Sequence, residues 1–155
     1  MSLIIQNAHL SQLDEITHLM RLSKAYWGYD KTFLDRFMKI IGIKADYLNN
    51  NNIKLVYLDD QLIGFYNFFR HTDHSFELDN FFLHPDYIGK GLGRKMWQFC
   101  CADAQQVGIT EFIIWSDPNA ENFYIKMGCQ KIGERKSPMM PNRFPPILKY
   151  SLNKE

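Results

Sequence analysis

The pattern of hydrophobic and polar positions divides the chain into short strands and amphipathic helices. Apolar residues recur at helical spacing in four segments, which predicts helices at about 11–23, 31–41, 92–107 and 118–127. Short apolar or alternating runs between polar turns predict strands at about 3–5, 53–57, 62–69, 76–83, 112–115 and 147–152. The four asparagines at 49–52 are interpreted as a polar break between elements.

The order of these elements predicts a mixed sheet. The three strands within 53–83 are joined by short polar turns, which indicates an antiparallel meander. After residue 83 the pattern becomes strand, glycine loop, helix and strand, and such a crossover makes its two strands parallel. No internal repeat or linker interrupts the pattern. We therefore expect one α/β (α+β) domain over residues 1–155, antiparallel in its first half, with a parallel crossover pair in its second half.

Local signals predict where the later helices end and which side they bury. Gly108 is expected to end the long helix, and Asp117 with Pro118 to begin the next one, which Gly128 closes. The buried stripe of the long helix is predicted to contain Leu92, Met96, Phe99, Cys100, Ala104 and Val107.

Composition and charge narrow the classes of protein. With 155 residues, of which 46% are hydrophobic, the chain can bury a core. A net charge of +1 gives no indication of a nucleic-acid surface. No apolar run is long enough to span a bilayer and no signal peptide begins the chain, so we expect no membrane contact and a cytoplasmic location. Three cysteines, two of them adjacent, are expected to be small buried residues rather than a disulfide framework.

The segment from Gly89 to Arg94, with glycines at 89, 91 and 93, carries the main candidate chemistry. Alternating glycines allow consecutive backbone N–H groups to turn into one concavity, at the positive end of the following helix. Such a site binds phosphate or pyrophosphate. Lys90, Arg94 and Lys95 add positive charge nearby.

Two familiar phosphate loops do not fit this spacing. A nucleotide P-loop needs four residues between its first glycine and Gly-Lys-Ser/Thr. A dinucleotide fingerprint needs a third glycine where Arg94 or Met96 stands, depending on its start. A pyrophosphate cradle for coenzyme A remains, beside the simpler alternative of a glycine-rich turn that only opens a helix.

Two motifs resemble the signatures of the GNAT superfamily of N-acetyltransferases. The run 77–94 resembles the family's strand, proline and Arg/Gln-x-x-Gly-x-Gly/Ala loop, and 119–128 resembles its Asn-x-x-Ala-x-x-Phe-Tyr-x-Lys-x-Gly helix, one residue shorter. The first loop position falls on Ile88 rather than Arg or Gln, which removes a polar side chain from the cradle and predicts weaker or altered binding. The resemblance implies a GNAT-like sheet that splays at the acetyl-CoA site, with helices on both faces.

The resemblance also implies the residues that bind acetyl-CoA and act on it. The strand end Phe82–Leu83 is expected to pair with the pantetheine arm and to polarise the thioester carbonyl. Tyr124 matches the family's tyrosine that protonates the leaving thiolate; a core aromatic is the alternative. The implied cofactor-binding residues are Phe82, Leu83, Ile88, Gly89, Lys90, Gly91, Leu92, Gly93, Arg94, Asn119, Phe123, Tyr124 and Lys126.

A carboxylate is needed to take a proton from the attacking amine, because an alkylammonium has a pKa of about 10. Glu77 and Asp79 are expected on one strand face, where each would raise the pKa of the other. Glu77 is the first choice, because some family members place a glutamate base at this distance before the loop. His84 is an alternative base, and exposed strand charges are the simple alternative for both carboxylates. We expect no metal site.

The acceptor amine is open at this stage. The resemblance places the acceptor pocket near Tyr26, Trp27 and Tyr29, with Arg143 as another lip, although core packing would also explain the aromatics. The expected function is transfer of acetyl from acetyl-CoA to a primary amine of a small molecule or peptide, with no nucleic-acid or membrane partner. Non-catalytic acetyl-CoA binding, or use of another acyl-CoA, are the alternatives. Exposed edge strands make a homodimer an additional expectation.

Overall fold

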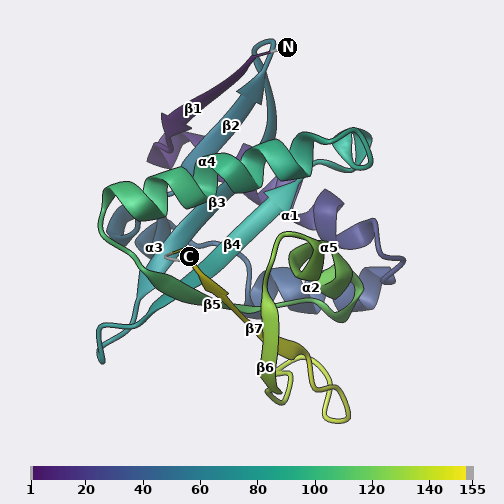
Figure 1. Ribbon diagram of the computed structural model, residues 1–155. Coiled ribbons are helices and arrows are strands. Elements are labelled where there is room, and N and C mark those ends of the chain that lie inside the picture. The colour runs from purple at the N-terminus through teal and green to yellow at the C-terminus, as the bar shows by residue number, and fades with distance from the viewer. Residues whose placement is uncertain (1, 153–155) are drawn as a thin grey trace. The chain divides into compact units, whose positions relative to one another are not determined.

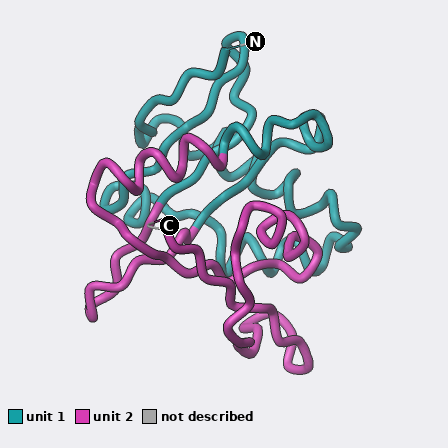
Figure 2. Tube along the Cα trace, in the orientation of Figure 1, with its two compact units in different colours: residues 1–67, 80–96 teal, residues 68–79, 97–155 magenta. Residues whose placement is uncertain are grey.

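The computed structural model describes residues 2–152 (Figure 1). The chain forms two compact units, which Figure 2 distinguishes by colour. Unit 1 comprises Met1–Asn67 and Asn80–Met96, and unit 2 comprises Phe68–Asp79 and Trp97–Glu155. The single domain expected from the sequence stays a prediction.

Most of the helices and strands lie close to the predicted segments, but strand β6 and helix α3 were not predicted. The strands are β1 (Leu3–Asn7), β2 (Lys54–Leu58), β3 (Gln61–Arg70), β4 (Phe76–Leu83), β5 (Glu111–Trp115), β6 (Gln130–Glu134) and β7 (Pro146–Ser151). The α-helices are α1 (Leu13–Ala25), α2 (Lys31–Ile40), α3 (Ala45–Asn50), α4 (Leu92–Gln106) and α5 (Glu121–Lys126). Short 3-10 turns cover Leu10–Gln12, Pro85–Tyr87 and Pro118–Ala120.

The described residues contain a mixed sheet of seven strands. Hydrogen-bonded neighbours follow the order β1-β2-β3-β4-β5-β7-β6. Strands β1 and β2 pair antiparallel, as do β2 and β3. Strand β5 pairs parallel with β4, with Glu77 opposite Ile113, and antiparallel with β7. The predicted mixed sheet, with its antiparallel beginning and its parallel crossover pair, is therefore confirmed.

Helices cover both faces of β3 within unit 1. Gly64 lies against the Met96 side chain of α4, and a Cβ at Gly64 would come within 2.7 Å of that sulfur. Asn67, whose odd position points to the other face of the strand, bonds to Tyr47 of α3 at 2.8 Å. The buried core of this unit includes Ile16, Met20, Leu55, Phe65 and Tyr66.

An aromatic cluster forms the core of unit 2. The ring of Trp97 on α4 contacts Phe112 on β5 and Tyr150 on β7, at centroid distances of 5.8 and 5.1 Å. Trp97 also contacts Tyr124 on α5 at 5.9 Å. Phe112 packs against Phe68 of β3 at 5.0 Å. These contacts join helix α4, helix α5 and three strands around one tryptophan.

The predicted stripe of α4 was wrong at two positions. Phe99 and Val107 are 38% and 73% exposed, whereas Trp97 is buried. Apolar character alone does not show which side of a helix faces the core. Trp97 is buried because its ring packs against Phe112 and Tyr150. The predicted helix ends are confirmed, since Gly108 and Gly128 adopt φ values of +84° and +106°.

Helix α3 was missed because its end is rich in asparagine. The Nδ2 groups of Asn50 and Asn51 donate to the carbonyls of Asp46 and Tyr47, four residues earlier. The Tyr47 carbonyl is one of the last four of the helix, which have no intrahelical donor, so the Asn51 bond caps the end of α3. The segment interpreted as a polar break is therefore partly the capped end of a short helix.

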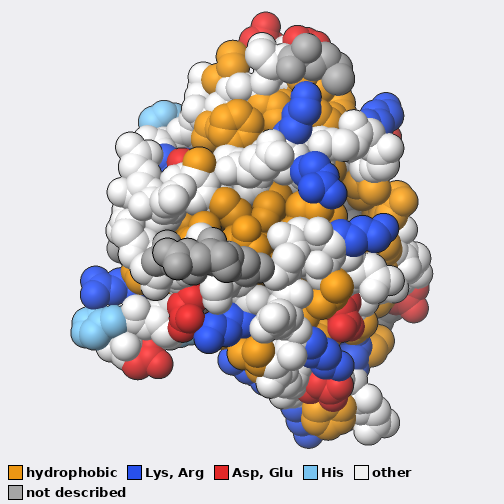
Figure 3. Space-filling view, in the orientation of Figure 1, with side chains coloured by type: hydrophobic (Ala, Val, Ile, Leu, Met, Phe, Trp, Pro, Cys, Tyr) orange, Lys and Arg blue, Asp and Glu red, His pale blue; other side chains and the backbone are white. Residues whose placement is uncertain are grey.

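The surface mixes apolar and charged groups. Figure 3 shows basic and acidic side chains scattered among hydrophobic ones on one face. Among residues 2–152, no helix combines the length and the apolar character that a bilayer crossing requires.

Candidate functional site

The glycine loop opens helix α4 in unit 1. Gly89 and Gly91 have φ values of +81° and +79°, which residues with a side chain rarely adopt. A Cβ on either glycine would meet no atom within 4 Å, so open space lies beside the backbone at both positions. The N–H of Lys95 donates to the carbonyl of Gly91, and the amides of residues 92–94 therefore have no acceptor four residues back in the helix. This is the backbone geometry of an anion-binding concavity.

The side chains of the loop leave it polar and open. Lys90 and Arg94 are exposed, and the Nζ of Lys90 lies 5.8 Å from the centroid of the Tyr87 ring. Leu92 is buried and anchors the start of α4 in the core. Ile88, at the departure from the family signature, is half-buried, and its N–H donates to the carbonyl of Pro85 at 3.2 Å.

The end of β4 is held firmly against β3 in unit 1. The rings of Phe82 and Phe65 stack with centroids 5.3 Å apart. The N–H of His84 donates to the carbonyl of Ile63 at 2.7 Å. Gly64 permits this packing, because a Cβ there would come within 2.7 Å of the Phe82 carbonyl oxygen. The predicted Phe82–Leu83 strand end is thus half-buried and fixed in position.

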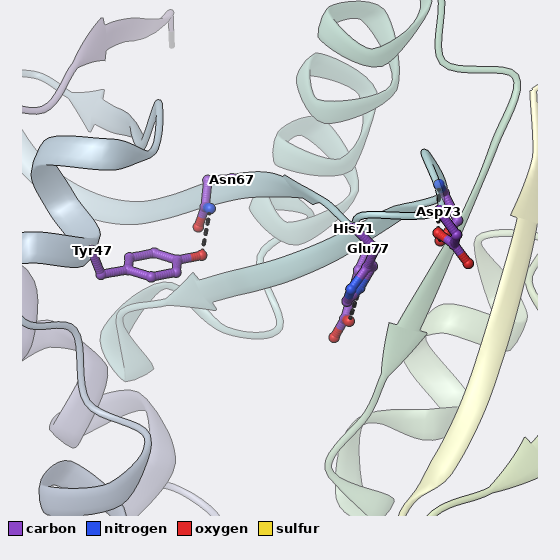
Figure 4. A network of polar contacts seen from close by, with 6 residues as sticks. Tyr47, Asn67, His71, Asp73 and Glu77 are labelled. Carbon is purple, nitrogen blue, oxygen red and sulfur yellow. Dashed lines mark hydrogen bonds and ion pairs between the residues drawn. The ribbon is translucent and has the colours of Figure 1, made fainter.

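A buried polar network in the same unit was not predicted, and Figure 4 shows its bond between Asn67 and Tyr47. Asn80 on β4 donates from Nδ2 to Oδ1 of Asn67 on β3 at 2.7 Å. Asn67 donates to the Tyr47 hydroxyl at 2.8 Å, and Asn80 lies 3.3 Å from the same oxygen. The available signal was an asparagine in each of two otherwise apolar strands, since buried amides require partners.

Glu77 is the buried carboxylate of unit 2. Its side chain lies on β4, and its Oε1 is 2.9 Å from Nε2 of His71 (Figure 4). Burial raises the pKa of Glu77, the negative charge of Asp79 raises it further, and the His71 hydrogen bond opposes both effects. Asp79 itself is exposed, so the two predicted carboxylates differ in environment. A raised pKa in a buried carboxylate suits a general base.

Tyr124 on α5 is buried in unit 2. Its ring contacts Trp97 and Phe123, at centroid distances of 5.9 and 5.3 Å. Burial raises the pKa of Tyr124 far above its ordinary value, so the hydroxyl keeps its proton at any physiological pH. It can therefore act as a neutral donor, and it also packs as a core aromatic.

Asn119 and Arg143, two other predicted site residues, both contact the carboxylate of Asp117. Its side chain accepts hydrogen bonds from the backbone N–H and the Nδ2 of Asn119, at 2.8 and 3.0 Å. Arg143 Nη2 lies 3.4 Å from the same carboxylate oxygen. The predicted helix start at Asp117 is confirmed by the first of these bonds. Phe123 is half-buried and Lys126 is exposed on the following helix.

The aromatics after α1 lie in unit 1 and are only partly buried. Tyr26 and Trp27 are 49% and 39% exposed and pack edge to face at 5.0 Å. Tyr29 stacks on Phe33 of α2 at 4.1 Å, with the Lys24 ammonium 5.3 Å from its ring. Tyr29 is therefore part of the packing between α1 and α2, whereas Tyr26 and Trp27 remain accessible.

His84 and the three cysteines, the remaining candidate bases and nucleophiles, have surroundings that fit a structural role. The Nδ1 of His84 accepts from the Asp86 N–H at 3.1 Å and caps the turn before the loop. Cys100 and Cys129 are buried, and burial raises the pKa of Cys101 to about 11, so that thiol stays protonated at neutral pH. Within residues 2–152, no group of three or more His, Cys, Asp or Glu side chains is arranged to hold a metal.

Unit 2 also contains a cavity of about 270 Å³ that is separate from the predicted site residues. Its lining comes from the turn before β4 and the starts of β4 and β5, and includes His74, Phe76, Glu111 and Lys149. None of the predicted site residues lines it.

Comparison with known proteins identifies the class. The sequence model described as the acetyltransferase (GNAT) family matches residues 15–129. The chain therefore belongs to the GNAT family of acetyltransferases, a class of acyl-transferring enzymes. None of the curated protein sequences gives a significant match.

Solved structures show the same fold at low sequence identity. The PaiA N-acetyltransferase of Thermoplasma acidophilum, in complex with coenzyme A, is 17% identical with a TM-score of 0.78, over 97% of this chain and 99% of that one. The ribosomal-protein-S18-alanine N-acetyltransferase of Escherichia coli is 16% identical with a TM-score of 0.69, over 99% and 96% of the two chains. N-acetylglutamate synthase of Neisseria gonorrhoeae, complexed with coenzyme A and N-acetyl-glutamate, is 16% identical with a TM-score of 0.72, over 99% of this chain and 36% of that one.

Proposed function

We propose that this protein transfers the acetyl group of acetyl-CoA to a primary amine. The observation that carries the proposal is the loop at Gly89 and Gly91. Both glycines have positive φ values with open space beside them, and they open a 15-residue helix in a chain of the GNAT family. A glycine turn that served only to begin a helix would not need two such positions in three residues.

The loop residues fit the pyrophosphate of coenzyme A. The amides of the loop and of the first turn of α4 would hold the phosphate oxygens, and Lys90 and Arg94 would supply mobile positive charge. Ile88 offers no side-chain donor, so the backbone carries most of this interaction. Asn119, Phe123 and Lys126 are the proposed further contacts with the cofactor.

The transfer itself requires three proton movements: loss of a proton from the ammonium, loss of a second proton from nitrogen as the amide forms, and protonation of the thiolate. The amine nitrogen attacks the thioester carbonyl carbon, a C–N bond forms, and the C–S bond breaks with the electron pair leaving on sulfur. Glu77 is proposed to accept the proton that the ammonium loses, directly or through water, with Asp79 as the alternative base. Tyr124 is proposed to donate a proton to the thiolate and to regain one, directly or through water, from the attacking nitrogen as the amide forms. A backbone N–H at Phe82–Leu83 is proposed to polarise the carbonyl.

Binding of acetyl-CoA is the first test. Isothermal titration with acetyl-CoA and with CoA would compare wild type with Gly91→Trp, which fills the open space beside the loop. Gly108→Trp is the matched control, since Gly108 also has a positive φ of +84° and open space but lies at the other end of α4. We expect micromolar or tighter binding by wild type and by the control, and loss of at least 30-fold in Gly91→Trp. Absence of binding by wild type, or an equal loss of affinity in both variants, would contradict the proposal that this loop binds coenzyme A.

A further inference from the structure

One face of the sheet in unit 2 carries a carboxylate on β4 and, across β5 and β7, a guanidinium just after the end of β6. Glu77 on β4 lies directly opposite Ile113 on β5, and paired residues on adjacent strands point to the same face. Trp115 follows Ile113 by two residues, so it shares that face. Ile147 on β7 pairs with Trp115, and Gly133 on β6 pairs with Ile147. The chain leaves β6 two residues after Gly133, at Arg135.

The side chain of Arg135 is stacked over the ring of Trp115. Its guanidinium carbon lies 4.9 Å from the centroid of the Trp115 ring, and its backbone N–H donates to the Pro145 carbonyl at 3.1 Å. Across the described part of the chain, its side chain makes no ion pair with a carboxylate. Stacking on the indole fixes the position of the cation while leaving its N–H groups available in the plane of the guanidinium.

Trp115 adds a second unused donor. Its Nε1 is buried and has no hydrogen-bond acceptor among residues 2–152. Leaving a buried donor unpaired costs about 1–3 kcal/mol, so native proteins rarely do so without a reason. The exposed guanidinium of Arg135 is positioned by this stacking to bind an anionic group, beside a buried indole N–H that has no acceptor of its own in residues 2–152.

Glu77 supplies the complementary charge on the same face. Its carboxylate is buried beside His71 and is close enough to Arg135 that the guanidinium charge lowers the carboxyl pKa, against the larger effect of burial. The other groups that act on Glu77 are His71 and Asp79. Because Arg135 is stacked over Trp115 of β5, the strand beside β4, its guanidinium and the Glu77 carboxylate lie on one face of the sheet and can bind opposite ends of one ligand.

We propose that the acceptor is an amino acid or a similar amino carboxylate, whose ammonium binds at Glu77 and whose carboxylate binds Arg135. This inference rests on the proposed acetyl transfer and assigns its substrate class. A diamine or polyamine does not fit, because its second ammonium would lie against a guanidinium.

Paired substrates test the assignment. Acetyl transfer would be measured by release of the CoA thiol, at saturating acetyl-CoA, for amino acids and for the amines that lack only the carboxylate: alanine with ethylamine, phenylalanine with phenethylamine, and lysine with cadaverine. We expect kcat/KM to favour at least one amino acid over its paired amine by 30-fold or more. Equal values within every pair, or a preference for the amines, would overturn the proposal.

Variants at Arg135 and Lys136 test whether Arg135 is responsible for the preference for amino acids over amines. Arg135→Gln should raise KM for the preferred amino acid at least 10-fold, with kcat and the KM for acetyl-CoA within twofold of wild type. Lys136→Gln is the matched control, because it removes the same charge from the adjacent exposed position. An equal effect of both variants, or a fall in kcat alone, would contradict a carboxylate contact at Arg135.

Direct titration separates the two proposals. If wild type binds no acetyl-CoA, the proposed acetyl transfer fails. Calorimetric titration of the amino acids themselves then still tests the proposed site at Glu77 and Arg135. Amino-acid binding that is 10-fold weaker in Arg135→Gln supports this site, and no binding by wild type overturns it. If wild type binds acetyl-CoA and acetylates amines without regard to a carboxylate, the transfer stands and only the substrate class is wrong.

Discussion

Asn80 on β4 donates a 2.7 Å hydrogen bond to Asn67 on β3, and both amides are buried in unit 1. Replacing Asn80 with leucine leaves Asn67 Oδ1 without its donor, and we expect a loss of about 1–3 kcal/mol in the free energy of unfolding. The double variant Asn67→Leu/Asn80→Leu should cost less than the sum of the single changes, because no orphaned amide remains between the two strands. Urea unfolding at a common m-value measures all three, and strict additivity would contradict the coupling.

The close approach at Gly64 makes a second prediction about stability. A Cβ there would lie 2.7 Å from both the Phe82 carbonyl oxygen and the Met96 sulfur, and the backbone oxygen cannot move aside cheaply. Gly64→Ala should therefore lose about 1–3 kcal/mol in urea unfolding. Gly133→Ala is the control, since a Cβ at that strand position meets nothing within 4 Å, and it should stay within about 0.5 kcal/mol of wild type. A neutral Gly64→Ala would show that β4 is not fixed as described.

Ile88 is the departure from the family signature, and restoring a polar residue tests its consequence. Ile88→Gln adds a side-chain donor beside the loop at a half-buried position. One added hydrogen bond of about 0.5–1.5 kcal/mol predicts coenzyme A binding about 2–10 times tighter. Ile88→Leu should leave the affinity unchanged. Titration calorimetry decides, and weaker binding by the glutamine variant would show that Ile88 suits this loop better than the usual residue.

Tyr124→Phe removes the proposed proton donor while keeping the buried ring. We expect kcat to fall about 100-fold with little change in KM for acetyl-CoA, because the hydroxyl is needed only as the thiolate leaves. Tyr150→Phe is the matched control, since Tyr150 contacts the same Trp97 ring at 5.1 Å and has no proposed part in the reaction. Steady-state kinetics on both variants measures the difference. If Tyr124→Phe keeps wild-type kcat, Tyr124 is a core aromatic only.

Glu77→Gln tests the base through its pH dependence. In wild type, kcat/KM should fall with decreasing pH as Glu77 becomes protonated, at a pH above the ordinary glutamate range because burial raises the pKa of this carboxyl. The glutamine variant should be about 100-fold slower near neutrality and should lack that acidic limb. Its thermal stability supplies a second readout. Because the folded-state pKa is raised, wild type should lose stability relative to Glu77→Gln as pH rises from the ordinary glutamate value through the folded pKa. A shared pH profile would exclude Glu77 as the base.

The sequence by itself determined the antiparallel beginning of the sheet, its parallel crossover pair and the glycine loop. The strand at Phe76–Leu83 was predicted at its observed bounds, because an alternating apolar run between a polar turn and a proline has few other structures. Gly89, Gly91 and Gly108 were predicted as turn or cap residues, and their positive φ values follow from local sterics that the chain carries with it.

Tertiary structure decided the features that depend on partners distant in the sequence. Strand β6 has mostly exposed residues and no alternating pattern, and it forms because β7 pairs with it. Trp97 rather than Phe99 faces the core, because Phe112 and Tyr150 lie where Trp97 points. Glu77 was proposed from its spacing, but its burial and its bond to His71 come from packing. Arg135 and Trp115 meet only through the pairing of β5, β7 and β6, because strand register, which no local pattern encodes, sets which side chains share a face.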